Sequence, residues 1–417
     1  MNLNISPITG CNVKGKTVIL RLDINSPIDA DTKKIVNFNR IKKSLPTLEY
    51  LQKNGAKIAI IAHQGDTLDY QNLISMQEHA KILDELTGYK VSYIEDVCGP
   101  SAINAVKDLK DGESILLGNL RYLGEELSTF EKDVKLTPEQ MTQTWLIRSL
   151  APLADVYVND AFAAAHRSSP SMIGFEEVLP SYAGFLFFEE YKALSQVANN
   201  AKKPTVFVLG GAKISDAFGM MESVLQNGTA DYILVQGVTG IVMQIANGAD
   251  FGKKTTEFLR SKDLLGFIGL AKDYISKYSD KIICPVDFAF EKDGERQEIG
   301  ISQLPSENLF LDIGKKTIEM FSKIILDAAT IFANGPAGVY EDERFSKGTE
   351  QIFKAIAKSN AFSIIGGGDT VTSASKFIDL KDISYVCTAG GAMVRFMSGK
   401  TLPLISAMQK AYKRQNS

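Results

Sequence analysis

The chain has 417 residues, more than one hydrophobic core usually serves, so we expect two domains. Its 46 Lys and Arg residues nearly balance its 49 Asp and Glu residues, giving a formal net charge of −3. This balance argues against a nucleic-acid binder that relies on bulk positive charge. Hydrophobic residues make up 45% and charged residues 23% of the chain, which is typical of globular rather than disordered proteins.

The sequence also gives no sign of export, membrane insertion or a cysteine-rich site. No apolar run approaches the ~18 residues that a membrane span needs, and the first ten residues lack the pattern of a signal peptide. The four cysteines are scattered and form no CxxC pair, which favours the reducing cytoplasm. With only three histidines, the chain is unsuited to a metal cage built from several imidazoles.

Strands, loops and helices alternate along the whole chain. Short apolar runs rich in Val and Ile indicate parallel α/β structure, with strands buried on both faces. The first half is expected to form strands at 17–20, 57–62, 114–117 and 155–158, with helices such as 40–54 and 75–87 between them. The second half is expected to form strands at 205–209, 232–235, 281–284, 330–333, 362–365 and 385–387.

A helix with few breaks separates the two halves. Phe188, Tyr191 and Leu194 recur at helical spacing, and a polar stretch ending at Pro204 stops the helix. We therefore predict two doubly wound parallel-sheet domains joined by a connecting helix and a hinge. The predicted boundaries are 1–184 for the first domain, 185–200 for the helix and 201–398 for the second domain.

In the first half, cationic and hydrogen-bonding side chains follow the predicted strands. Ligands of open parallel sheets bind beyond the carboxyl ends of the strands, and several Arg forks converging there favour a small polyanion. Each Arg could instead be an ordinary surface ion-pair partner. The recurrence after successive strands favours the anion site. The residues concerned are Arg21, Arg40, His63, Arg121 and Arg167.

In the second half, the predicted strands end in glycine. Glycine lets the backbone approach a ligand and turn sharply into a helix, whose N-terminal N–H groups bind phosphate. A single glycine loop would indicate only a tight turn, but four or five in one domain favour a nucleotide phosphate site. These loops begin at Gly210, Gly237, Asn334, Gly366 and Gly390.

A small anion on one domain and a nucleotide on the other indicate phosphoryl transfer, with domain closure excluding water. Asp369 follows three glycines, so it could hold Mg²⁺ or could merely cap the following helix. Neither a P-loop nor a G-x-G-x-x-G fingerprint after a strand is present, which disfavours a nicotinamide-dependent dehydrogenase.

Taken together, these segments resemble the phosphoglycerate kinase family, and some of the sequence motifs are similar to those of its archaeal branch. The resemblance runs in order over almost the whole chain. The matching segments are Arg21-Leu22-Asp23-Ile24-Asn25-Ser26-Pro27, Ala62-His63-Gln64-Gly65, Leu117-Gly118-Asn119-Leu120-Arg121, Asn159-Asp160-Ala161-Phe162, His166-Arg167, Leu209-Gly210-Gly211-Ala212-Lys213, Asn334-Gly335-Pro336 and Gly366-Gly367-Gly368-Asp369-Thr370.

The resemblance implies reversible transfer between 1,3-bisphosphoglycerate and ADP, giving 3-phosphoglycerate and ATP with Mg²⁺. It implies catalytic roles for Arg40, Lys213, Gly390 and Gly391, and a metal role for Asp369. The implied substrate-binding residues are Arg21, Asp23, Asn25, Arg40, His63, Gln64, Gly65, Asp66, Arg121 and Arg167. The implied nucleotide-binding residues are Gly211, Ala212, Lys213, Gly237, Asn334, Pro336, Glu341, Gly367, Gly368, Asp369 and Thr370. It further implies that the C-terminal tail, 399–417, packs back on the first domain.

Four positions depart from the family's pattern, namely Asp66, Ala217, Ala389 and Met393. Asp66 stands where an Arg is usual and adds an anion near the expected polyanion site. A catalytically weak relative that only binds its ligands is therefore an alternative to an active kinase. We expect a cytoplasmic monomer, with a dimer as the alternative, and no nucleic-acid or membrane partner. His79 is expected at the surface or half-buried, and Trp145 in the core.

Overall fold

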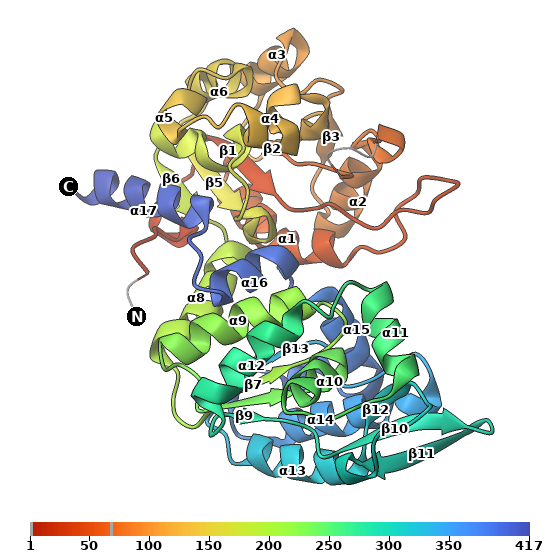
Figure 1. Ribbon diagram of the computed structural model, residues 1–417. Coiled ribbons are helices and arrows are strands. Elements are labelled where there is room, and N and C mark those ends of the chain that lie inside the picture. The colour runs from red at the N-terminus through yellow and green to blue at the C-terminus, as the bar shows by residue number, and fades with distance from the viewer. Residues whose placement is uncertain (1–2, 67–69) are drawn as a thin grey trace. The chain divides into compact units, whose positions relative to one another are not determined.

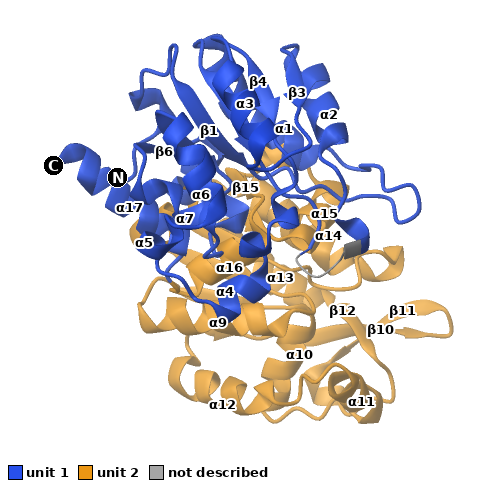
Figure 2. Cartoon of the chain, turned by 90° about the horizontal axis from the view of Figure 1, so that it is seen from above, with its two compact units in different colours: residues 1–192, 401–417 blue, residues 193–400 orange. Residues whose placement is uncertain are grey.

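The computed structural model describes residues 3–66 and 70–417, and the chain forms two compact units. Unit 1 holds the described residues up to Lys192 together with Thr401–Ser417, and unit 2 holds Ala193–Lys400, as coloured in Figure 2. Helix α8 (Phe185–Asn200) contributes to both units, because the boundary falls inside it. Each unit contains a six-stranded sheet whose neighbours are all parallel, so the predicted fold class is confirmed.

Unit 1 has the strand order β3-β4-β2-β1-β5-β6. Figure 1 labels strands β1, β2, β3, β5 and β6 of this sheet. The strands are β1 (Thr17–Leu22), β2 (Lys57–Ile61), β3 (Val91–Tyr93), β4 (Ser114–Leu116), β5 (Val156–Asp160) and β6 (Ser181–Ala183). Successive residues of β1 point to opposite faces, so Val18 and Leu20 enter one core and Ile19 the other. Helices α1 (Asn39–Lys53) and α2 (Gln77–Thr87) cover the first face. Helices α3 (Pro100–Asp108) and α6 (Trp145–Leu150) cover the second.

Unit 2 has the strand order β15-β14-β13-β7-β8-β9. The strands are β7 (Thr205–Leu209), β8 (Tyr232–Val235), β9 (Ile282–Ile283), β13 (Thr330–Asn334), β14 (Phe362–Gly366) and β15 (Tyr385–Cys387). Its helices include α9 (Ile214–Gln226), α10 (Gly237–Ala246), α11 (Lys253–Ser261), α12 (Phe267–Tyr278), α13 (Lys315–Leu326), α14 (Lys347–Lys358), α15 (Gly368–Phe377) and α16 (Gly390–Met397). Apolar side chains of α13 and α14 pack with Val206 and Val208 in one core.

Unit 2 also contains a three-stranded antiparallel sheet that the sequence analysis missed. It consists of β10 (Asp287–Lys292), β11 (Glu295–Gly300) and β12 (Phe310–Ile313), in the order β11-β10-β12. Strand β11 carries several charged residues and no apolar run, so its composition gives no strand signal. The turn before β11 does give a sequence signal, because it consists of Asp293 and Gly294. These residues have φ values of 52° and 83°, as a tight hairpin requires.

The remaining differences from the sequence-based expectations are local. Strands β3 and β6, of three residues each, were also missed. Trp145 is 56% exposed, so its placement in the core was wrong. Of the helices in the described residues, none combines the length and apolarity needed to cross a membrane.

The C-terminal helix α17 (Pro403–Asn416) packs within unit 1. The amide of Leu404 donates to the carbonyl of Ala165 at 3.3 Å. The side-chain oxygen of Gln415 accepts from the amide of Ser181 at 3.0 Å, and Arg414 pairs with Glu177 at 3.1 Å. The last residues of the chain therefore complete a unit built mainly from the first half of the sequence.

Candidate active-site residues

In unit 1, the predicted cationic residues lie together at the carboxyl ends of the strands. We call this group the cation cluster: Arg21, Arg40, His63, Arg121 and Arg167. Arg21 belongs to β1, His63 follows β2, and Arg121 follows β4 in a 3-10 turn. The four guanidinium groups all act electrostatically on His63, which places the cluster around this ring.

His63 is the neutral member of the cation cluster. Burial and the charges of the surrounding arginines hold its pKa well below the usual value. The Nη2 of Arg21 lies 2.8 Å from the Nδ1 of His63. Because a guanidinium can only donate, Nδ1 must accept and the ring proton must sit on Nε2. His63 is therefore a neutral hydrogen-bond donor beside four positive charges.

The loop after His63 is fixed by a set of buried amide side chains. Gln64 accepts from the amide of Ser26 at 2.9 Å and lies 3.0 Å from Nε2 of His79, and its own amide donates to the Ser26 carbonyl at 2.9 Å. His79 is fully buried, so its expected surface position was wrong. Asn25 accepts from the amide of Gly65 at 3.0 Å. Asp66 is exposed at the end of this loop.

Two buried carboxylates, Asp23 and Glu126, and the partly buried Glu131 partly neutralise the cation cluster. Asp23 pairs with Arg40 at 2.9 Å, and the carboxylate of Glu131 straddles the Nε of Arg167 at 2.8 and 3.0 Å. Glu126 accepts two bonds from Ser171, at 2.6 and 2.7 Å, and its backbone carbonyl accepts from Arg121. Burial, together with the charges of Arg167 and Arg21, lowers the pKa of Arg121 to about 10.

Several buried polar atoms of the cluster have no hydrogen-bond partner among the residues that the structure describes. They are Nε of Arg121, Nη2 of Arg167 and Oδ1 of Asp23. A buried donor left unpaired is costly, whereas a bound anion would satisfy both guanidinium groups. The arrangement suits a small ligand with at least two anionic or hydroxyl-bearing ends.

In unit 2, the glycine loops line a cavity of about 210 Å³, which we call the glycine-lined cavity. Its walls come from the ends of β7, β13 and β14 and from the start of α16. The lining residues are Gly210, Gly211, Ala212, Lys213, Asp216, Asn334, Gly335, Pro336, Gly367, Gly368, Asp369, Thr370, Gly390, Gly391 and Val394. Three loops and a helix start that the sequence marked separately therefore meet around one space.

Two glycines of this cavity are required by the backbone. Gly335 has a φ of 92°, and a Cβ there would lie 2.1 Å from the carbonyl oxygen of Gly210. Gly367 has a φ of 96°, and its Cβ would lie 2.7 Å from Nδ2 of Asn334. Thr370 fixes the same loops, because its Oγ1 accepts from the amide of Gly335 at 2.8 Å. The cavity wall is thus backbone at close approach.

A second space, of about 340 Å³, shares four residues with the first, and we call it the apolar cavity. Gly211, Ala212, Pro336 and Asp369 line both. The predicted residues Gly237 and Glu341 also line it. The sequence analysis missed its apolar lining, which includes Val238, Ile241, Phe258, Phe288, Leu309, Phe310, Leu311, Val339 and Tyr340. An apolar chamber joined to a glycine-rich one suits a ligand with a flat apolar end and a phosphate end.

Two carboxylates, those of Asp216 and Asp369, line the glycine-lined cavity. Asp369 is exposed in the first turn of α15. In the described parts of the chain, no three His, Cys, Asp or Glu side chains group as metal ligands would. Mg²⁺ commonly takes one or two carboxylates and completes its shell with water and phosphate oxygens. The residues present fit that mode of binding.

Comparison with known proteins gives a consistent result over the full length. The sequence profile described as phosphoglycerate kinase matches residues 8–400. A phosphoglycerate kinase of Methanothermus fervidus is 41% identical over 402 residues, covering 96% of both chains. The one of Thermococcus kodakarensis is 41% identical and covers 98% of both. The crystal structure of the Pyrococcus horikoshii enzyme has a TM-score of 0.88 at 39% identity, covering 98% of this chain and 100% of that one.

Proposed function

The chain belongs to the phosphoglycerate kinase family, and on that premise we propose that unit 1 binds 3-phosphoglycerate and unit 2 binds the nucleotide. The activity is that of a phosphotransferase: a phosphoryl group passes reversibly between the acyl phosphate of 1,3-bisphosphoglycerate and ADP. Transfer from 1,3-bisphosphoglycerate to ADP gives 3-phosphoglycerate and ATP.

We propose that the cation cluster holds the two anionic ends of 3-phosphoglycerate. The unpartnered Nε of Arg121 and Nη2 of Arg167 support this assignment, as does the Nε2–H of His63. Asp23 and Asn25 would bind the glycerate hydroxyl, and Arg21 would orient His63. Gln64 uses its side chain within the protein, so we propose that it supports the loop of Gly65 and Asp66.

For the nucleotide, we propose the base and ribose in the apolar cavity and the phosphates in the glycine-lined cavity. Glu341 would accept a ribose hydroxyl, with Gly237, Ala212 and Pro336 packed against the nucleoside. Backbone N–H groups at the start of α15 and α16 would bind phosphate oxygens. The residues proposed on the phosphate side are Gly211, Lys213, Asn334, Gly367, Gly368, Asp369, Thr370, Gly390 and Gly391.

We propose Asp369 as the protein ligand for Mg²⁺, which would neutralise the nucleotide phosphates when bound. No covalent nucleophile or general base is needed, because the attacking oxygen is already ionised. Arg40 would stabilise the moving phosphoryl group, and Lys213 and the amides of Gly390 and Gly391 would stabilise charge on the nucleotide phosphates. Catalysis is then alignment and preorganised electrostatics.

Two features support proposals for the cellular location and the oligomeric state of the protein. Cys11, Cys98 and Cys284 are free thiols, which suits the cytoplasm as the proposed location. Both ligand sites are built within one chain, so we propose a monomer. Light scattering coupled to size exclusion tests this, because a dimer would elute with twice the mass.

One observation supports the substrate assignment best: unpartnered guanidinium nitrogens buried around a neutral histidine. The test is a coupled assay with ATP, 3-phosphoglycerate and Mg²⁺, in which the chain should consume ATP and Arg40→Ala should not. Calorimetric ADP binding without turnover would instead indicate a binding protein, as the substitution at Asp66 allows. Binding of NADH without ADP would exclude the proposed nucleotide site.

A further inference from the structure

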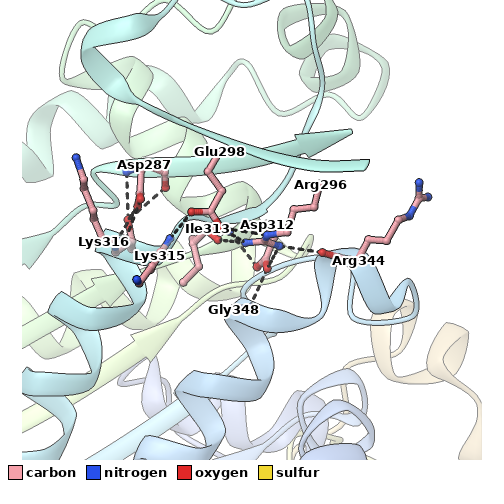
Figure 3. Close-up of polar contacts among 10 residues, drawn as sticks. Asp287, Arg296, Glu298, Asp312, Ile313, Lys315, Lys316, Arg344 and Gly348 are labelled. Carbon is pink, nitrogen blue, oxygen red and sulfur yellow. Dashed lines mark hydrogen bonds and ion pairs between the residues drawn. The ribbon is translucent and has the colours of Figure 1, made fainter. Parts of the chain in front are cut away.

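Arg296, on the small antiparallel sheet of unit 2, uses all five of its N–H groups (Figure 3). Nε and Nη2 donate to Glu298 at 3.1 and 3.0 Å. Nη1 donates to Asp312 at 2.8 Å and to the carbonyl of Arg344 at 3.0 Å. Nη2 also donates to the carbonyl of Ile313 at 2.9 Å. One side chain therefore ties β11 to β12 and to the turn that precedes α14.

Asp312 is the central acceptor of this network, and its side chain is completely buried. Oδ2 accepts from the amide of Gly348 at 2.8 Å as well as from Arg296, and Oδ1 accepts from the amide of Ile313 at 2.9 Å. Added Cβ atoms at Gly338 and Gly348 would lie 2.4 and 2.2 Å from Oδ1. Both glycines thus pack directly on the carboxylate, and Asp312 fixes two segments that follow β13.

The same carboxylate lies at the wall of the apolar cavity. Asp312 lines this cavity together with its neighbours Leu311 and Ile313. The carbonyl of Leu311 accepts from the amide of Val339 at 2.8 Å, which attaches the loop carrying Glu341 to β12. The loop that would bind the ribose is therefore held on one side by β12 and on the other by Gly338 against Asp312.

The small sheet has a separate source of cohesion. Phe251, Phe288, Phe290 and Phe310 form an aromatic cluster with ring centroids 5.0 to 5.9 Å apart. Removing apolar contact of this kind would unfold the sheet, whereas a buried ion pair adds little net stability. What the ion pair supplies is a fixed position for the segments around it.

We propose that Arg296 and Asp312 form a positioning pair that sets nucleotide affinity by holding the Gly338–Glu341 loop against β12. This inference rests on the proposed function, since it takes the apolar cavity as the nucleoside site. Neither residue is proposed to touch the phosphoryl groups. Loss of the pair should therefore weaken nucleotide binding and leave 3-phosphoglycerate binding unchanged.

The experiment compares Arg296→Met with Arg344→Met in the full chain. Arg344→Met removes a cation of the same length, whose side chain pairs with half-buried Asp342 and donates to the carbonyl of Gly294, and it keeps the carbonyl that Arg296 uses. Calorimetry with ADP should show a Kd raised about ten-fold for Arg296→Met and unchanged for Arg344→Met. The KM for 3-phosphoglycerate should stay within about two-fold in both. Arg296→Lys, which keeps a positive charge beside Asp312, should restore part of the ADP affinity.

Two results would overturn the positioning role. One is Arg296→Met that melts at a lower temperature but binds ADP as the unaltered chain does. The other is an equal rise in the KM of both substrates. If Arg296→Met does not fold, Asp312→Asn, which keeps the shape of the side chain, replaces it with the same expected rise in the Kd for ADP. Failure of the unaltered chain to bind ADP at all would instead refute the proposed nucleotide site.

Discussion

On the proposed assignments, the two units bind an anionic ligand in opposite ways. Unit 1 offers charged side chains, whose repulsion is offset by buried Asp23 and Glu126 and by partly buried Glu131. Unit 2 offers backbone N–H groups at glycine turns, where close approach and positive φ would do what charge does in unit 1. Charge can be removed without altering the backbone, whereas a glycine turn can be blocked without altering charge. The two sites should therefore fail in different ways.

The largest effect is expected from removing charge at Arg40. Its side chain is 40% exposed but pairs with buried Asp23, so Arg40→Ala should fold with a lowered melting temperature. An arginine that stabilises a transferring phosphoryl group contributes about 10³-fold or more to kcat. We expect a loss of that size in the coupled assay, with Arg40→Lys recovering little because it lacks the planar fork. A loss below about ten-fold would remove Arg40 from the reaction.

Blocking a turn in unit 2 should give the next largest effect. Gly367→Ala places a methyl group at a φ of 96° and 2.7 Å from Asn334, so the loop must shift. We expect kcat/KM for ATP to fall about a hundred-fold while the KM for 3-phosphoglycerate holds. Gly368→Ala is the matched comparison, since its added Cβ meets nothing within 4 Å. Equal losses in the two variants would show that close approach is not what the turn provides.

Sequence patterns predicted the glycine turns and the cationic strand ends because both are local. An apolar run such as 205–209 marks its own strand, and the glycines after it mark their own turn. The acids that pair with the arginines are not local: Glu131 and Arg167 are 36 residues apart. Arg296 and Asp312 likewise meet only through an antiparallel sheet whose outer strand lacks an apolar pattern. Such partners follow from tertiary structure, which no spacing rule contains.

The burial of His79 also could not be predicted from local sequence patterns. It allows a test of stability against pH that concerns unit 1. Burial lowers its pKa to about 4, below the value of 6.5 that it has when unfolded. The unfolded chain therefore binds a proton first as the pH falls through 6.5, so stability is lost on the acid side and retained above it. Between pH 7.5 and 5.0, this histidine should remove about 2 kcal/mol from the free energy of unfolding.

Urea titrations of the unaltered chain and His79→Gln at both pH values check this contribution. The glutamine amide can still donate to Gln64, so the variant should fold at pH 7.5. The stability difference between the two chains should then shift by about 2 kcal/mol in favour of His79→Gln at pH 5.0. A difference that does not change with pH would mean that His79 is protonated in the folded state.

The smallest expected effect separates two roles for Glu131. Its carboxylate holds only the Nε of Arg167, and Nη2 stays buried and unpartnered. If Glu131 orients the guanidinium for the substrate, Glu131→Gln should raise the KM for 3-phosphoglycerate about three-fold with kcat unchanged, because the ion pair becomes a weaker bond from Arg167 to a neutral amide. If it instead occupies the place of a substrate anion, the same variant should lower that KM. We expect the KM to rise, because the edge of the guanidinium formed by its two Nη atoms faces away from a carboxylate bound at Nε. A lower KM would mean that the acidic side chains of unit 1 compete with the substrate for the arginines. The acids that reduce repulsion among the arginines would then also limit the affinity for 3-phosphoglycerate.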